Sequence, residues 1–243
     1  MEEKTLILSD IHGNLTALNR ILERAEGEPV KNIILLGDLI DYGPRSNEVL
    51  ERLDQIPKEK ICVNLWGNHE HAIMTENYGR FSSDRGRQSA QYTRRKLTAE
   101  SIEYLTGMNK DGRQEFLLGG KKCLAVHASL EDVFWKSIDM ENISDDYSKY
   151  DYVFSGHSHI AHYMQKFYKS NHKEYRYLKR TVFINPGSVG QPRNHSPAAQ
   201  AAIFNATMGS VEMLAVEYDV EAEMKLFPVV LDSFYKERLK KGI

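Results

Sequence analysis

The sequence predicts an α/β fold. Through its first half, short apolar runs typical of β-strands alternate with segments whose apolar residues recur at helical spacing, the pattern of parallel strands joined by right-handed crossovers. The second half consists mainly of further strand-type runs. No internal repeat and no linker rich in Gly, Pro or Ser interrupts the 243 residues, so we expect one domain over residues 1–243. Periodicity alone allows a single doubly wound sheet as well as two mixed sheets.

The expected elements follow one another along the chain. The first strand precedes a helix with Leu15 and Leu18 on its apolar face, for which Asn14 is a suitable N-cap, and a similar helix follows the second strand. Residues 71–113 are polar and helical, which fits a helical cap inserted between strands, and FYKERLKK (234–241) predicts a short surface helix. The predicted strands are TLILSD (5–10), NIILLGD (32–38), ICVNLWGN (61–68), CLAVHAS (123–129), YDYVFSGHSH (150–159), TVFINPGS (181–188), AAIFNA (201–206) and VEMLAVEYD (211–219).

Charge and composition narrow the class of protein. The chain has 32 basic and 34 acidic side chains, a balance that argues against a bulk nucleic-acid binder. The N-terminus lacks a signal-peptide core and no apolar run is long enough to cross a bilayer, so we expect a soluble cytoplasmic protein with no membrane partner. Cys62 and Cys123 lie in apolar strand-type runs and are expected to be buried, reduced thiols.

Five of the predicted strands end in side chains that can bind metal ions. Because open α/β sheets place their ligands at the carboxyl ends of strands, we expect these side chains to gather at one edge of the sheet. Imidazole, carboxylate and amide groups without thiolates suit Mn, Fe, Zn or similar divalent ions, and about seven ligands are too many for one tetrahedral ion but suit two ions bridged by one carboxylate. Strand by strand, these residues are Asp10 and His12; Asp38 and Asp41; Asn68, His69 and Glu70; His127; and His157 and His159.

These residues form motifs in a recognisable order. The motifs are DxH (Asp10, His12), GDxxD (Gly37, Asp38, Asp41), GNHE (67–70), the lone His127 and GHxH (156–159). The set resembles the calcineurin-like metallophosphoesterase superfamily over Ser9 to about His159, and NPGSVGQPR (185–193) resembles its bacterial and archaeal branch of YfcE-like or diadenosine-tetraphosphatase-like proteins. The resemblance implies an α/β/β/α sandwich of two mixed sheets flanked by helices, with a dinuclear metal site at the sheet edge.

The resemblance also implies a role for each motif residue. One ion is expected on Asp10, His12, Asp38 and His159, and the other on Asp38, Asn68, His127 and His157, so that Asp38 bridges the two. His69 is expected to act as general acid for the leaving oxygen, and a hydroxide held by the metals is the expected nucleophile. The expected cofactors are two divalent ions, with Mn or Fe favoured over Zn, Ni or Mg.

The implied activity is hydrolysis of phosphodiester or phosphoanhydride bonds in a small nucleotide-like substrate, dinucleoside polyphosphates among them. One alternative is a phosphoprotein or general phosphomonoester phosphatase, although Tyr42 stands where protein phosphatases of this superfamily have arginine in GDxVDRG. The other is a non-catalytic scaffold, against which all motif residues are present. The expected partner is a small phosphorylated substrate, and both a monomer and a homo-oligomer remain open.

The residues around the motifs have several interpretations. Asp41, Glu70 and His71 are expected to orient ligands or fix loops rather than bind a metal. Residues 75–96, rich in arginine and interleaved with aromatics, form either a solvated helical face or a cap that attracts a polyphosphate and stacks on a base. NPGSVGQPR predicts a tight turn that supports the metal edge, with Arg193 as an alternative phosphate contact. The remaining histidines treated as ordinary polar residues are His162, His172 and His195.

Overall fold

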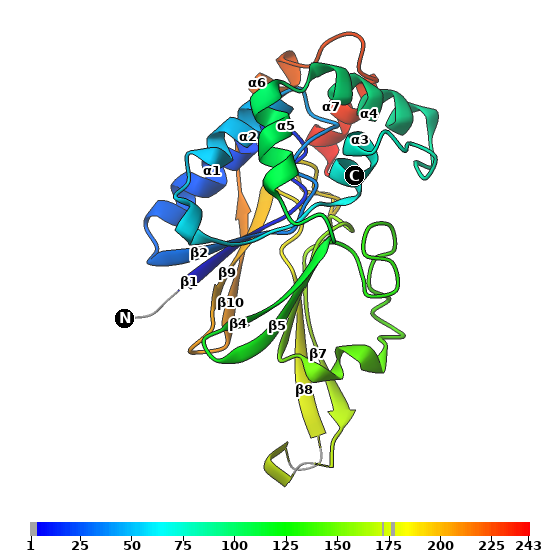
Figure 1. Cartoon of the computed structure of the whole chain (residues 1–243). Coiled ribbons are helices and arrows are strands. Elements are labelled where there is room, and N and C mark those ends of the chain that lie inside the picture. Colours follow the sequence, from blue (N-terminus) through cyan, green and yellow to red (C-terminus); the bar gives the residue numbers. More distant parts are fainter. Residues whose placement is uncertain (1–3, 172, 176–177) are drawn as a thin grey trace.

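Two five-stranded sheets form the framework of the computed structural model, which describes residues 4–171, 173–175 and 178–243 (Figure 1). The first sheet has the order β10-β9-β1-β2-β3, with β1 (Lys4–Leu8), β2 (Val30–Leu35), β3 (Ile61–Asn64), β9 (Ala199–Asn205) and β10 (Ser210–Val216). The second has the order β4-β5-β6-β8-β7, with β4 (Arg113–Leu118), β5 (Lys121–Val126), β6 (Tyr152–Ser155), β7 (His162–Lys169) and β8 (Leu178–Asn185). His172 lies outside the described residues.

Each sheet combines parallel and antiparallel pairs. β1, β2 and β3 run parallel to one another, as do β5, β6 and β8. The other pairs, β1 with β9, β9 with β10, β4 with β5, and β7 with β8, are antiparallel. The predicted sandwich of two mixed sheets flanked by helices is thus confirmed, and a single doubly wound sheet is excluded.

The central strands are apolar on both faces because both faces are buried. Along β1, Leu6 and Leu8 pack toward the helices, whereas Ile7 lies in the layer between the sheets. Phe154 of β6 and Phe204 of β9 contribute to the same inter-sheet layer from opposite sheets. Strands buried in this way read as continuous apolar runs, which is why the sequence revealed them clearly.

Helices cover the first sheet and the end of the sandwich that carries the motif loops (Figure 1). The helices are α1 (Leu15–Glu26), α2 (Ser46–Asp54), α3 (Asn68–Met74), α4 (Asp84–Lys96), α5 (Ala99–Gly107), α6 (Val220–Lys225) and α7 (Ser233–Lys241). The side chain of Asn14 accepts a hydrogen bond from the backbone N–H of Ala17 at 3.0 Å, which confirms the predicted N-cap of α1. The outer face of the second sheet is covered by residues 130–150, which contain the short 3₁₀ helix Asp145–Lys149.

Three expectations about individual elements need correction. The edge strands β4 and β7 were not predicted, because their alternating and largely polar residues lack an apolar run. The C-terminal helix is not merely a surface element, since α7 buries Tyr235, Arg238 and Leu239. Cys123 is buried and Cys62 only half-buried; both are free thiols.

Among the described residues, no helix has the length and apolar character needed to span a membrane.

Candidate metal centre

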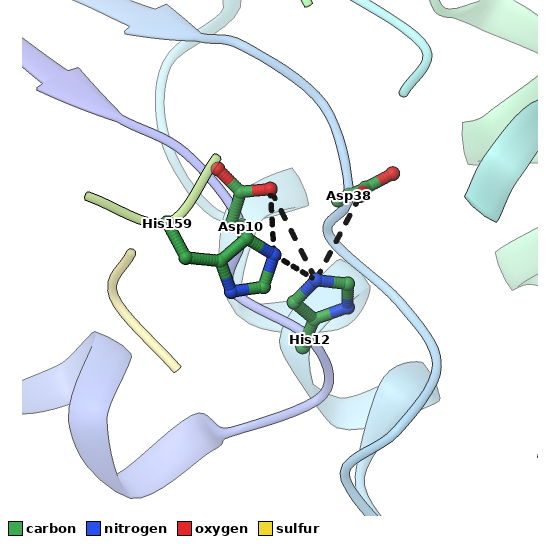
Figure 2. A group of neighbouring side chains, drawn as sticks. All are labelled: Asp10, His12, Asp38 and His159. Atoms are coloured by element: carbon green, nitrogen blue, oxygen red, sulfur yellow. Dashed lines mark hydrogen bonds and ion pairs between the residues drawn. The ribbon is translucent and has the colours of Figure 1, made fainter. Parts of the chain in front are cut away.

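The predicted metal ligands meet at one end of the sandwich, in the loops after β1, β2, β5 and β6 and in the first turn of α3. The strands that carry them belong to both sheets, so the ends of the two sheets form the site together. Figure 2 shows four of these side chains converging from three loops: Asp10 and His12 after β1, Asp38 after β2, and His159 after β6.

The side chains form two groups that share one carboxylate. The ligand atoms of Asp10, His12, Asp38 and His159 lie within 4.8 Å of one another, and so do those of Asp38, His127 and His157. Asn68 joins the second group, since its Oδ1 lies 3.0 Å from His127 Nε2 and 2.9 Å from His157 Nδ1. The structure therefore brings all seven predicted ligands together, with Asp38 between the two groups.

The imidazoles present lone pairs to the centre of these groups. The Nδ1 atoms of His12, His127 and His159 lie 3.1, 2.7 and 2.7 Å from backbone carbonyl oxygens, which only accept hydrogen bonds. In a neutral ring, Nδ1 therefore carries the proton and Nε2 is free to bind a cation. His12 Nε2 faces His159 Nε2 at 3.2 Å, a contact between two like acceptors that a cation would relieve.

The acidic residues fit a cation equally well. Asp10 Oδ1 is buried with no hydrogen-bond partner in the described part of the chain, and it lies 3.3 Å from His159 Nε2. Burial, together with the nearby Asp38 carboxylate, raises the pKa of Asp10 to about 7. Such a cluster of oxygen and imidazole nitrogen atoms suits divalent ions of the Mn, Fe or Zn type.

Asp38 and His127 form a close pair within the cluster. His127 Nε2 lies 3.4 Å from Asp38 Oδ2, and both residues are fully buried. Burial opposes the charged form of His127, but the Asp38 carboxylate overcomes this and raises the pKa of the imidazole to about 9. The site thus attracts positive charge at its centre, where the two groups meet.

The loops that carry the ligands adopt a backbone conformation that ordinary residues avoid. Five predicted ligands have left-handed φ angles of 48° to 64°, namely Asp10, His12, Asp38, His157 and His159. His157 and His159 therefore lie in a loop after β6 rather than on one face of an extended strand, as their i, i+2 spacing alone would indicate. Backbone strain of this kind concentrates at functional sites.

His69 lies beside the cluster, and Asp41 fixes the orientation of its ring. Its Nε2 is 4.0 Å from Asp38 Oδ2, and its Nδ1 contacts Asp41 Oδ2 at 2.7 Å. The other oxygen of Asp41 accepts hydrogen bonds from the hydroxyls of Ser89 and Thr93 on α4, at 2.6 and 2.8 Å. Asp41 therefore orients the His69 ring and lies outside the two ligand groups.

Glu70 fixes the loops rather than entering the cluster. Its carboxylate accepts backbone N–H groups of Asp38, Leu39 and Gly67 at 2.7 to 2.8 Å. It thus ties the loop after β2 to the start of α3, as predicted. His71 points elsewhere and stacks on Phe134 with ring centroids 4.5 Å apart.

The segment NPGSVGQPR (185–193) supports the loop that carries Asp10. Ser188 Oγ donates to the backbone oxygen of Asp10 at 2.6 Å, and the N–H of Gly190 donates to the same oxygen at 3.1 Å. A Cβ on Gly190 would lie 1.8 Å from the backbone oxygen of Ile11, so only glycine permits this approach. These contacts agree with the predicted role of the segment in supporting the metal site.

His162 is half-buried on β7 and His195 is exposed; neither belongs to the ligand groups.

The arginine-rich segment 75–96 mostly pairs its charges locally. Arg80 contacts Asp132 at 2.6 Å, Arg94 lies 3.3 Å from Glu76, and Arg87 pairs with Asp84. This pairing favours the interpretation as a solvated face for these three arginines. Arg85 differs, because its guanidinium carbon lies 4.1 Å from the ring centroid of Phe234 on α7.

An aromatic stack above the site was not foreseen from the sequence. Tyr42 lies 4.6 Å from the His12 ring and 4.4 Å from the His69 ring, and Tyr235 of α7 stacks on Tyr42 at 4.4 Å with an interplanar angle of 17°. Residues so far apart in the chain share no spacing signal. The C-terminal helix thus packs directly against the residues that surround the cluster.

Comparisons with known proteins agree with this geometry. Residues 4–209 match the model of the calcineurin-like phosphoesterase superfamily domain. An uncharacterized protein, MJ0912 of Methanocaldococcus jannaschii, is 29% identical over 248 residues, covering 97% of each chain. A crystal structure of a metallophosphoesterase from Sphaerobacter thermophilus superposes with a TM-score of 0.75 and 27% identity, covering 100% of both chains.

Relatives with named activities match over shorter stretches. Phosphodiesterase YfcE of Escherichia coli is 34% identical over 68 residues, which is 25% of this chain and 37% of the relative. An asymmetrical bis(5'-nucleosyl)-tetraphosphatase of Oceanobacillus iheyensis is 34% identical over 73 residues, covering 26% of this chain and 29% of the relative. These are the two groups of proteins that the motifs resemble.

Proposed function

This chain belongs to the calcineurin-like phosphoesterase superfamily, and we propose that it is a two-metal phosphoesterase that hydrolyses phosphodiester or phosphoanhydride bonds of small nucleotide-like substrates. The observation that carries the proposal is the pair of buried ligand groups sharing Asp38. Two cations held by one bridging carboxylate suit an in-line displacement at phosphorus. The similarity to a phosphodiesterase and a dinucleoside tetraphosphatase supports the substrate class. A cytoplasmic location stays a prediction.

The proposed ligand sets are those of the two groups. Asp10, His12, Asp38 and His159 would hold one ion, and Asp38, Asn68, His127 and His157 the other, with Mn or Fe the favoured metals for these nitrogen and oxygen ligands. When bound, such ions neutralise charge on a phosphate and lower the pKa of water toward neutrality. The lone pairs fixed by the Nδ1 hydrogen bonds, and the orphaned Asp10 oxygen, favour this arrangement.

We assign the proton transfer to His69. Burial opposes the charged form of its imidazole, but the carboxylates of Asp38 and Asp41 outweigh burial and raise its pKa. With Nδ1 held on Asp41, a protonated His69 presents Nε2–H toward the cluster, where it would donate its proton to the leaving oxygen. General acid catalysis of this kind contributes about 10²–10⁴-fold to a rate.

The experiment compares three substrates on metal-stripped protein resupplied with Mn²⁺. The substrates are bis(p-nitrophenyl) phosphate, p-nitrophenyl phosphate and diadenosine tetraphosphate. We expect metal-dependent cleavage of the diester or the dinucleotide, and we expect Asp38→Asn and His69→Ala each to lower the rate by at least about 100-fold. Asp54→Asn, which alters an exposed carboxylate on α2, serves as the matched control and should leave the rate unchanged.

Two results would contradict the proposal. Protein that binds Mn²⁺ at both groups yet cleaves none of the three substrates would favour a non-catalytic scaffold. Cleavage of the monoester alone would favour a phosphomonoester phosphatase.

A further inference from the structure

Three arginines from distant parts of the chain lie beside the metal cluster and form what we call the arginine cluster: Arg85 on α4, Arg193 after β8 and Arg238 on α7. Helix α7 lies beyond residues 4–209, the part that the family model matches.

The ring of Phe234 links two members of the cluster. The guanidinium carbon of Arg85 lies 4.1 Å from its centroid and that of Arg238 lies 5.1 Å from it. Two cations on one aromatic ring are held in fixed positions and kept near each other. Helix α4 is thereby joined to helix α7 through side chains that carry positive charge.

Arg193 places the third charge next to a predicted ligand. Its backbone N–H donates to the backbone oxygen of His159 at 3.1 Å. Arg193 therefore lies directly beside the loop that carries His159.

The cluster is connected to the metal centre by packed side chains. Tyr235, three residues before Arg238, stacks on Tyr42, which in turn packs on His12 and His69. Gln191 Nε2 donates to the backbone oxygen of Tyr235 at 3.4 Å. The first turn of α7 is thus fixed against the loops that surround the cluster of ligands.

Among the described residues, no Asp or Glu side chain forms an ion pair with an arginine of the cluster. Arg238 is only 7% exposed, and its Nε donates a hydrogen bond to an oxygen of Ile243, the last residue, at 2.5 Å. Arg193 Nε is buried without a hydrogen-bond partner among the described residues. Burial together with the Arg193 charge lowers the pKa of Arg238 to about 10.

Other arginines near this end of the sandwich form ion pairs with carboxylates. Arg45, half-buried, pairs with Glu223, and Arg87 and Arg94 on α4 pair with carboxylates. Guanidinium groups without a carboxylate side chain as partner, beside a phosphoesterase site, therefore match an anionic ligand, and their planar geometry fits phosphate oxygens.

We propose that the arginine cluster binds a second phosphate group of the substrate, so that the preferred substrates carry at least two linked phosphates. One phosphate lies at the metal centre, where its bond is cleaved, and the neighbouring phosphate lies on Arg85, Arg193 and Arg238. The inference rests on the proposed function and narrows it to phosphoanhydrides of the nucleoside polyphosphate class.

The test compares substrates with one and with several phosphates on the metal-loaded full chain. We expect Arg238→Gln and Arg85→Gln to lower kcat/KM for diadenosine tetraphosphate by about 10–100-fold, mainly through KM, as for loss of a charge-assisted hydrogen bond. Cleavage of bis(p-nitrophenyl) phosphate, which has one phosphate, should stay nearly unchanged. Arg95→Gln, an exposed position on the same helix as Arg85, is the matched control and should affect neither substrate.

A binding measurement separates this inference from the proposed function. Calorimetric titration with the magnesium complex of inorganic tripolyphosphate should show binding to the wild type and the Arg95→Gln variant but weakened binding to the other two. If that pattern holds while no substrate is cleaved, the arginine cluster stands and the phosphoesterase proposal fails. If hydrolysis proceeds but both cluster variants bind tripolyphosphate like wild type, or lose equal activity on both substrates, the inference is wrong. The exposed side chain of Arg85 keeps the test valid should Arg238→Gln fail to fold.

Discussion

Buried carboxylates and imidazoles fill the metal end of the sandwich, whereas the far end, where β7 pairs with the start of β8, leaves Phe167 and Leu178 exposed (Figure 1). At the metal end, polar groups are buried and the backbone is strained; at the hairpin end, apolar groups are exposed and the strands are regular. The metal end thus buries polar groups that proteins usually expose, and the hairpin end exposes apolar groups that proteins usually bury.

This difference indicates at which end the structure tolerates amino-acid substitutions. A left-handed aspartate or histidine persists only where surrounding contacts hold it, as Glu70 holds the loop of Asp38. Each side chain at the metal end therefore depends on several others. The exposed side chains at the hairpin end have few neighbours, so substitutions there should act alone.

The largest loss of activity expected from this comparison is that of Gly67→Ala at the metal end. A Cβ at Gly67 would lie 2.1 Å from Asp38 Oδ1 and 2.7 Å from His127 Cε1, so the shared carboxylate must move. We expect a loss of about 1–3 kcal/mol in the free energy of unfolding and about 100-fold in hydrolysis, measured by denaturant unfolding and by initial rates.

The matched control for this prediction is Gly27→Ala at the end of α1. Nothing lies within 4 Å of a Cβ at Gly27, so this change should cost neither stability nor activity. Equal behaviour of the two variants would show that the packing around Asp38 is not the constraint described above.

An intermediate effect is expected from Asp41→Asn. The amide keeps the size of the side chain but removes the charge behind His69, so kcat should fall about 10–100-fold while KM and bound metal stay nearly constant. Thr93→Val removes one hydroxyl donor to Asp41 and leaves the carboxylate on His69, so its loss should be smaller. A fall in metal content with Asp41→Asn, measured by atomic emission, would instead assign Asp41 to the metal groups.

The smallest effect is expected from Phe167→Ser at the hairpin end. The ring is 57% exposed, so the free energy of unfolding should change by no more than about 0.5 kcal/mol and hydrolysis should not change. Phe154→Ala in the same sheet, at a fully buried ring between the sheets, should cost about 3–5 kcal/mol by the same unfolding measurement. A change in oligomeric state with Phe167→Ser, seen by light scattering, would contradict the view that this ring acts alone.

The sequence predicted the metal end better than the rest of the molecule. Continuous apolar runs located β1, β2 and β6 because these strands are buried on both faces, and the polar residues that follow them marked the loops. The edge strands β4 and β7 escaped notice because an edge strand needs no apolar run. The left-handed conformations of Asp10 and His157 could not be predicted, since they depend on contacts made between loops.

Sequence reasoning failed where distant segments meet. Arg238 and Tyr235 looked like members of an ordinary surface helix, because nothing local distinguishes a helix that covers a site from one that faces solvent. The basic residues of α4 were recognised as a group, but nothing local distinguishes Arg87, which pairs with Asp84, from Arg85, which lies over the ring of Phe234. The metal ligand assignments came from resemblance and stay predictions that the geometry favours.

The origin of the ligands in both sheets has a consequence for biosynthesis. A nascent chain emerges from its N-terminus, so Asp10, His12 and Asp38 exist before His127 and His159 are made. Neither ligand group can be complete until the loop after β6 has been synthesised and the second sheet has docked on the first. Metal ions would therefore bind only after the two sheets have packed together. A partly synthesised chain would have no complete ligand group and so could not bind an incorrect ion there.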